Sequence, residues 1–168
     1  LKITRLDAGS VAFFKKVCNA KELARQALEE FTDRAEWEKK ELLLSGEDGA
    51  RVYCDPEWSR EALCNLVKNA LDHTGEGGKI RITWEQMPLM TRFTVADNGE
   101  GIAETDIHHI FKRFYRSGSG RGTGLGLPLA RSIVEGQDGT LSVQSEKGAG
   151  AVFTLSFPNG EENLQGRQ

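Results

Sequence analysis

The sequence lacks any apolar run approaching the roughly 18 residues that span a membrane, and no charged-then-apolar leader opens it. Because it begins with Leu1, we expect a fragment whose targeting signals lie elsewhere. Cysteine is scarce, and Cys18, Cys54 and Cys64 form no CxxC pair. We therefore expect reduced, partly buried thiols in a cytoplasmic domain and no cysteine-based metal site.

Acidic residues are missing from one long stretch of an otherwise acidic chain. Between Ile107 and Val134 there is no Asp or Glu, although the net charge of the whole sequence is −3. The stretch carries five basic residues: Lys112, Arg113, Arg116, Arg121 and Arg131. The negative net charge argues against a general nucleic-acid binder. The local basic excess fits either a solvated face or a site for an anionic ligand.

Local signals predict helices and strands in a chain of 168 residues, a length that suits one domain with its own core. Helix starts are indicated at Asn19 and at Asp55-Pro56, and a third helix is expected over 126–135. The first helix carries apolar residues at Leu23, Ala27 and Phe31. Strands are expected at 51–55, 79–86, 91–97, 140–146 and 151–157. Without regular strand–helix alternation, the expected class is α+β, a mixed sheet covered on one face by helices.

The helix expected over 57–74 has unusual polar residues. One face is apolar, and the other carries Glu61, Asn65, Lys68, Asn69 and Asp72. Asn in a helix interior costs roughly half a kcal/mol or more relative to Ala, and surface helices usually carry Lys, Glu or Gln instead. The face is therefore either an ordinary solvated surface or a polar stripe directed at a ligand. Amide oxygens suit a metal ion, and amide N–H groups suit a phosphate.

The segment TRFTVADNGEGI (91–102) places Asp97 where an alternating strand ends. A half-buried carboxylate there is suited to accept a hydrogen bond from an exocyclic amine such as that of adenine. Gly99 and Gly101 allow the backbone to pass close to a flat ring or a phosphate. An ordinary turn is the alternative, because Asp-Asn-Gly is also common turn chemistry.

The stretch RSGSGRGTGLGLPLAR (116–131) has glycine at every second position from 118 to 126. It matches neither GxxxxGK[ST] nor GxGxxG, the two familiar phosphate loops. It leads directly into a helix start, where backbone N–H groups and the helix dipole favour an anion. A disordered linker is the alternative, but Leu125 and Leu127 between the glycines are unusual for a linker.

Together these stretches resemble, in order and spacing, the ATP-binding catalytic domain of bacterial sensor histidine kinases in the GHKL superfamily. The N box of that family is matched by EALCNLVKNALDHT and the first glycine box by DNGEGI. The phenylalanine box is matched by IFKRFYR and the second glycine box by GTGLGL. The resemblance covers about residues 1–157. It implies a two-layer α/β sandwich of the Bergerat type with a flexible ATP lid.

The resemblance implies ATP and Mg²⁺ as cofactors and assigns a role to each matching position. Asn65 would ligate Mg²⁺, Glu61 would act as general base or orient the acceptor histidine, and Asp97 would accept from the adenine amino group. Arg116 would neutralise charge on the γ-phosphate. The implied nucleotide-binding positions are Asn65, Asn69, His73, Asp97, Gly99, Gly101, Ile102, Tyr115, Arg116, Gly122, Thr123, Gly124, Leu125, Gly126 and Leu127.

The lid itself would be 117–121, anchored by Phe111 and Phe114 in the core or against the dimerisation helices. The sequence departs from the family pattern at Asp72, where members often carry Lys or Arg. Asp72 cannot supply a cation for phosphate, so that role is lost or passes to Lys68 or Arg113. His73, the next residue, suits stacking on a purine or a purely structural role.

The resemblance also implies a domain organisation. Residues 1–10, which include RLDAGS, would end the second dimerisation helix, 11–158 would form the catalytic ATP-binding domain, and 159–168 would be a disordered tail. None of the three histidines fits the acceptor motif, so we expect Mg-ATP binding without self-phosphorylation. The expected partners are the protein's own dimerisation domain, as a homodimer, and a response regulator. We expect a cytoplasmic domain of a membrane-anchored sensor kinase that binds no nucleic acid.

Three other functions remain open at this point. The same ATP fold serves topoisomerase and mismatch-repair ATPases of the GHKL superfamily, which need a transducer domain after it. An anti-sigma-factor serine kinase has a similar length, but it should lack the RLDAG and IFKRFYR segments. A nucleotide-blind interaction domain would fail to bind Mg-ATP.

Overall fold

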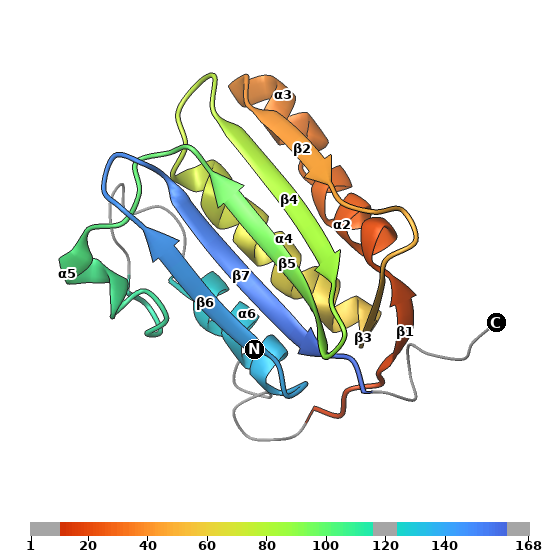
Figure 1. Cartoon of the computed structure of the whole chain (residues 1–168). Helices are drawn as coiled ribbons and strands as arrows, with labels where there is room; N and C mark the ends of the chain where they lie inside the picture. Colours follow the sequence, from red (N-terminus) through yellow and green to blue (C-terminus); the bar gives the residue numbers. More distant parts are fainter. Residues whose placement is uncertain (1–10, 116–123, 161–168) are drawn as a thin grey trace.

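In the computed structural model, which describes residues 11–115 and 124–160, five strands form one sheet with helices on one face (Figure 1). The strand order is β2, β4, β5, β7, β6, and β2 runs parallel to β4 while the other neighbours are antiparallel. The strands are β2 Glu41–Ser45, β4 Lys79–Gln86, β5 Met90–Asp97, β6 Thr140–Ser145 and β7 Ala151–Pro158. The predicted α+β class with a mixed sheet is confirmed.

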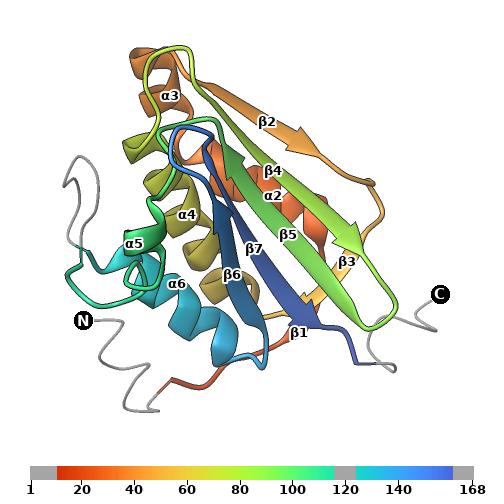
Figure 2. The same cartoon turned by 60° about the vertical axis from the view of Figure 1, so that its left-hand side comes forward.

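Three helices lie side by side on the covered face, with α4 between α2 and α6 (Figure 2). These three are α2 (Ala20–Glu29), α4 (Pro56–Asp72) and α6 (Gly126–Glu135). The described residues also form two shorter helices, α3 (Thr32–Glu38) and α5 (Glu104–Ile107). The predicted starts of α2 and α4 are confirmed by their caps. The Asn19 side chain accepts from the Glu22 N–H, and Asp55 accepts from two backbone N–H groups of the first turn of α4.

The core lies between the helices and the inner face of the sheet. Alternate residues of β5 and β7 are buried, and Phe93 meets Phe157 edge to face, with ring centroids 6.1 Å apart. Helix α4 contributes Leu63, Leu66 and Val67, all fully buried. Each such side chain stabilises the fold by about 1.5–3 kcal/mol through burial of apolar surface. This packing holds α4 against the sheet, and it therefore also sets the direction of the polar face of α4, which carries Glu61, Asn65 and Asn69.

Several elements differ from the expectation. The first helix ends at Glu29, before Phe31, and is followed by α3 and β2, which the sequence patterns did not predict. A strand β1 (Lys16–Asn19) pairs with β3 (Arg51–Cys54) in an antiparallel ribbon apart from the main sheet. Only β3 of this pair was predicted. The sequence of its partner, KVCN, shows no alternation of apolar and polar residues.

The predicted tail begins too early. Asn159 is buried, its Nδ2 donates to the Met87 carbonyl at 2.7 Å, and its Oδ1 accepts from the Thr91 hydroxyl at 2.9 Å. The ordered domain therefore includes this residue. The expected dimerisation helix (1–10) and the rest of the expected tail (161–168) lie outside the described residues. No helix in the described part of the chain is long and apolar enough to cross a membrane.

Candidate functional site

A pocket opens where the C-terminal half of α4 meets the ends of β5 and β7 and the first turn of α6. Its lining combines polar and apolar side chains from segments far apart in the sequence: Asn69, His73, Asp97, Gly101, Ile102, Ile110, Leu127 and Ala151. Six of these eight residues are positions singled out by the sequence. The fold therefore brings the N box, the first glycine box and the second glycine box to one place.

Asp97 is the carboxylate of this pocket. It is the last residue of β5 and pairs with Ala151 of β7, which places it against the sheet end. Its Oδ1 accepts from the Gly99 N–H at 2.9 Å. Burial raises the pKa of Asp97, and the Gly99 and Ala151 N–H groups oppose that rise. The carboxylate is thus fixed by the backbone, half-buried, and suited to accept a hydrogen bond from a ligand.

Backbone segments pass very close to one another around Asp97. A Cβ on Gly99 would overlap the His73 carbonyl, and a Cβ on Gly101 would overlap the Glu146 carbonyl. Gly150 lies in the same way against the Asp97 carbonyl. Gly99 and Gly101 were predicted as site residues, whereas Gly150 was not. Its role depends on the pairing of β5 with β7, which no local pattern reveals.

Ser145 is a second residue that the sequence did not single out. Its hydroxyl accepts from the Ile102 N–H at 2.8 Å and donates to the Gly150 carbonyl at 2.7 Å. It therefore ties the first glycine box to the turn between β6 and β7. Serine is common at the end of a strand, so its presence at position 145 did not indicate this bridging role.

Asn65 lies beside the start of α6. Its Nδ2 donates to the Glu61 carbonyl at 3.0 Å, and a Cβ on Gly126 would lie 3.1 Å from its Oδ1. The amide is therefore oriented with its oxygen toward the first turn of α6, where an anion is favoured. A neutral oxygen at this place is the ligand type that Mg²⁺ accepts when phosphates supply the rest of its coordination. The residues present fit a magnesium–phosphate group.

His73 ends α4 and lines the pocket. Its Nδ1 lies 2.6 Å from Glu100 Oε1, and the Glu100 N–H donates to the His73 carbonyl at 3.1 Å. The ring is thus held by the first glycine box while it remains part of the pocket wall. This arrangement is compatible with both roles that the sequence left open.

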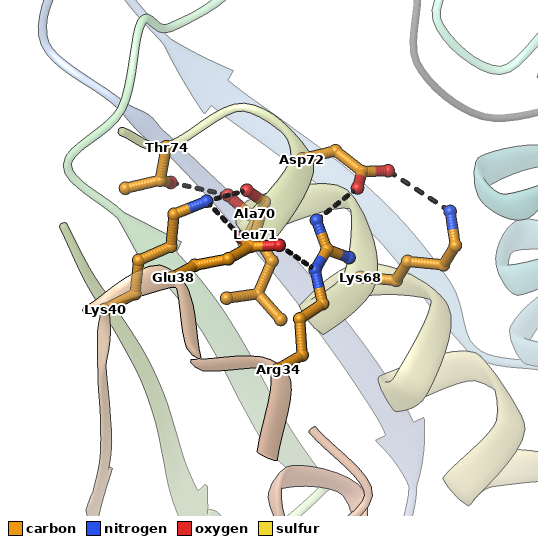
Figure 3. A network of polar contacts seen from close by, with 8 residues as sticks. All are labelled: Arg34, Glu38, Lys40, Lys68, Ala70, Leu71, Asp72 and Thr74. Carbon is orange, nitrogen blue, oxygen red and sulfur yellow. Dashed lines mark hydrogen bonds and ion pairs between the residues drawn. The ribbon is translucent and has the colours of Figure 1, made fainter. Parts of the chain in front are cut away.

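Asp72 is not among the residues that line the pocket, and it joins a network of charges between α3 and α4 (Figure 3). Its two carboxylate oxygens accept from Arg34 at 2.7 Å and from Lys68 at 3.2 Å. In the same network Lys40, nearly buried, donates to Glu38 and to the Leu71 carbonyl. The departure from the family pattern at Asp72 therefore has a structural explanation, the attachment of α3 to the C-terminal turn of α4.

The phenylalanine box divides between core and surface. Phe111 packs edge to face on Phe153, with ring centroids 6.4 Å apart, and Arg131 lies over its ring. Phe114 is 68% exposed, so this ring does not anchor the lid in the core, and the predicted alternative of contact with the dimerisation helices stays a prediction. The Phe114 N–H donates to the Gly124 carbonyl at 2.8 Å, which holds Phe114 close to the residues that precede α6.

Tyr115 donates its hydroxyl to Asp106, and this hydrogen bond raises the pKa of Tyr115. The ring therefore lies toward α5 and not toward the pocket lining. Leu125 precedes α6 and caps it without a side-chain hydrogen bond. Arg116, Gly122, Thr123 and the expected lid (117–121) lie outside the described residues, so their predicted roles stay predictions.

Comparison with known proteins decides the family. Residues 54–161 match the family model described as histidine kinase-, DNA gyrase B-, and HSP90-like ATPase. The chain belongs to this family. The match begins just before α4 and ends after β7, so it contains the whole pocket.

Curated relatives of this ATPase domain are sensor histidine kinases. The chain is 36% identical to the sensor histidine kinase RppB of Synechocystis over 171 residues, covering 94% of this chain and 36% of RppB. It is 34% identical to the sensor histidine kinase YvrG of Bacillus subtilis over 162 residues, covering 94% of this chain and 26% of YvrG. The chain thus spans about a third of the length of these relatives.

Solved structures of histidine kinases share the fold of this domain. The catalytic domain of the histidine kinase ThkA matches with a TM-score of 0.79 at 31% identity, covering 91% of this chain and 99% of that one. Full-length ShkA in complex with AMPPNP matches with a TM-score of 0.84 at 28% identity, covering 94% of this chain and 34% of ShkA. The expected histidine kinase catalytic domain is therefore confirmed as the kind of domain this is.

Proposed function

We propose that this domain binds Mg-ATP and transfers the γ-phosphate to a histidine on the dimerisation domain of a sensor histidine kinase. The phosphate is then relayed to a response regulator. The observation that carries the proposal is the fixed, half-buried Asp97 carboxylate in a pocket whose wall also holds Asn69 and His73. A carboxylate so placed accepts from the exocyclic amine of adenine, whereas guanine presents a carbonyl oxygen at the same ring position.

Asn65 is the proposed protein ligand of Mg²⁺. Such an ion would supply positive charge that offsets the charge of the phosphates. The chain's own part is to hold the amide oxygen in place through the Asn65–Glu61 hydrogen bond of 3.0 Å. The first turn of α6, beginning at Gly126, offers N–H groups and the positive end of the helix dipole to the phosphates.

Glu61 and Arg116 are the proposed catalytic residues. Glu61 lies one turn before Asn65 on the polar face of α4, where it can accept a proton from the incoming histidine or orient it. Arg116 would stabilise negative charge on the transferred phosphoryl group. We also propose that the domain works as a homodimer through its dimerisation domain, on the cytoplasmic side of a membrane-anchored sensor.

Transfer in trans tests this function. The chain is mixed with γ-labelled ATP, Mg²⁺ and the dimerisation domain of the same protein carrying its acceptor histidine. An acid-labile, alkali-stable phosphoryl group on the dimerisation domain is the expected product, and Glu61→Gln is expected to lower its rate by at least about a hundredfold. Release of inorganic phosphate alone would favour the ATPase alternative. An alkali-labile phosphoserine on a protein partner would favour the serine kinase alternative.

A further inference from the structure

A buried polar cluster lies at the ends of α4 and α6 that face away from the nucleotide pocket. Its members, Asp55, Ser59 and Gln137, are 5%, 0% and 1% exposed. Gln137 Oε1 accepts from the Asp55 N–H at 2.7 Å, and its Nε2 donates to the Ser59 hydroxyl at 3.1 Å. Nε2 also lies 3.3 Å from the Ile133 carbonyl in the last turns of α6. One side chain therefore joins the start of α4 to the end of α6.

The segment 11–15, which precedes β1, attaches to this cluster. The Phe14 N–H donates to Asp55 Oδ2 at 2.9 Å, and Lys15 Nζ donates to the Gln137 carbonyl at 3.0 Å. The Phe13 ring packs edge to face on Trp58, with centroids 6.0 Å apart. The backbone and two side chains of this segment are thus held by the same residues that hold the two helices.

Both helices run from the cluster to the pocket. Asp55 caps α4, and Asn65 lies about 15 Å further along it, at 1.5 Å per residue. Helix α6 ends two residues before Gln137 and begins about 15 Å away at Gly126, which lies against Asn65. Each helix therefore connects the cluster with the pocket, and a shift of either helix at the cluster would change the distance between Asn65 and Gly126.

We propose that Gln137 is a positioning residue that couples the 11–15 segment to the nucleotide pocket through α4 and α6. The inference rests on the proposed function, because it takes the pocket to be the nucleotide site. Coupling between two sites is reciprocal. If attachment of the 11–15 segment raises nucleotide affinity by a given factor, bound nucleotide strengthens the attachment of the segment by the same factor. Loss of the Gln137 side chain breaks the coupling from both directions.

Hydrogen exchange of two amides reads the coupling directly. The Phe14 N–H and the Asp55 N–H are both donors in the cluster and lie far from the pocket. Saturation of the wild-type chain with Mg-ADP is expected to slow exchange of both amides by at least about fivefold, the lower end of usual allosteric couplings. Nucleotide binding to the native state also slows every amide that exchanges through global unfolding, so a purely structural role for Gln137 gives these two amides no more protection than a core amide of β4 such as that of Ile82.

Three variants complete the test. Gln137→Met is expected to abolish the nucleotide-dependent protection and to weaken Mg-ADP binding about fivefold. Lys15→Met, which leaves the buried side chains in place, is expected to reduce the protection and serves if Gln137→Met does not fold. Phe14→Ala keeps the N–H donor and removes only an exposed ring, so it should behave as wild type.

Calorimetric titration of the same samples separates the two possible failures. If Mg-ADP binds and leaves the exchange of both amides unchanged, the coupling is refuted while the proposed function stands. If Mg-ADP does not bind to the wild-type chain, the proposed function itself fails and the inference falls with it. Protection that survives undiminished in a folded Gln137→Met variant would also overturn the role of Gln137.

Discussion

Asn65 and Gly126 meet where α4 passes the start of α6, and a Cβ at Gly126 would lie 3.1 Å from Asn65 Oδ1. This is closer than ordinary van der Waals contact, so an added methyl group forces the amide oxygen to move. The oxygen is held from the other side by the hydrogen bond between Asn65 Nδ2 and the Glu61 carbonyl. The relationship links the placement of the proposed Mg²⁺ ligand to the absence of a side chain at Gly126.

Gly126→Ala is therefore expected to weaken Mg-ATP binding at least about fivefold without lowering the unfolding free energy. Ala in a helix is more favourable than Gly by about 0.8–1 kcal/mol, which offsets the contact with Asn65. Affinity is measured by calorimetric titration and stability by urea unfolding. Gly49→Ala is the matched control, since a Cβ there meets nothing within 4 Å. Equal effects of the two substitutions on affinity would contradict the placement of Asn65.

Asp97→Asn separates binding from stability through pH. Because burial raises the pKa of Asp97, the ionised carboxylate lowers the unfolding free energy of the free domain as pH rises above the unfolded pKa. The Asn variant is therefore expected to be as stable as wild type or more stable near neutral pH. The difference should shrink as pH falls through the raised pKa of Asp97. Urea unfolding at a series of pH values measures it, with exposed Asp48→Asn as the control.

A wild-type domain that is clearly more stable than Asp97→Asn at neutral pH, with the gap closing in acid, would contradict this account. That result would require a stabilising ionised carboxylate with a lowered pKa. Asp97→Asn is expected to weaken Mg-ATP binding while it leaves the unfolding free energy unchanged or higher. Unfolding of the variant therefore cannot explain its loss of affinity.

Gly150→Ala tests the close approach of the β6–β7 turn to Asp97. Gly150 and Gly148 both have positive φ, +81° and +87°, but only a Cβ on Gly150 would overlap the Asp97 carbonyl. Each substitution incurs about 1–2 kcal/mol of backbone strain. Gly150→Ala is expected to lower the unfolding free energy by at least about 1 kcal/mol more than Gly148→Ala, which urea unfolding measures. It is also expected to weaken nucleotide binding, which calorimetric titration measures. Indistinguishable variants would show that the turn does not support the pocket.

Asp72→Asn tests the charge network of Figure 3. Arg34 and Asp72 are 26% and 11% exposed, whereas Lys68 is 51% exposed. We expect Asp72→Asn to lower the unfolding free energy by about 1–2 kcal/mol, between the values for exposed and buried ion pairs. Lys68→Met should cost no more than about 0.5 kcal/mol. A double-mutant cycle of Arg34→Met with Asp72→Asn measures the pair, and a coupling near zero would refute the attachment of α3 through it.

The elements predicted correctly are those whose signals are local. Alternation of apolar and polar residues marked β4 and β5, and Asn19 and Asp55 marked the starts of α2 and α4. Helix α3 has seven residues, no side-chain cap at its start and a left-handed C-cap at Lys39 in place of the usual glycine. Strand β2 has five residues and forms by parallel pairing with β4, whose first residue is 38 positions further along the chain. Neither element carries a local signature.

The residues of the candidate site that belong to short sequence motifs could be predicted. Asn69, Asp97 and Leu127 were singled out by residue type and by resemblance, and the fold brings them to one pocket. Ala151 and Ser145 join the pocket and its support only through the register of β7 with its two neighbours. Register depends on tertiary pairing, so a single sequence without a template could not place them.

Calorimetric titration of the chain with Mg-ATP shows whether the pocket formed by α4, α6 and the ends of β5 and β7 binds the nucleotide. We expect saturable 1:1 binding by wild type and at least about a tenfold loss of affinity for Asp97→Asn, since a hydrogen bond to a charged group contributes about 1.5–3 kcal/mol. Absence of binding by the folded wild-type chain, or equal affinity of the two proteins, would contradict nucleotide binding in this pocket.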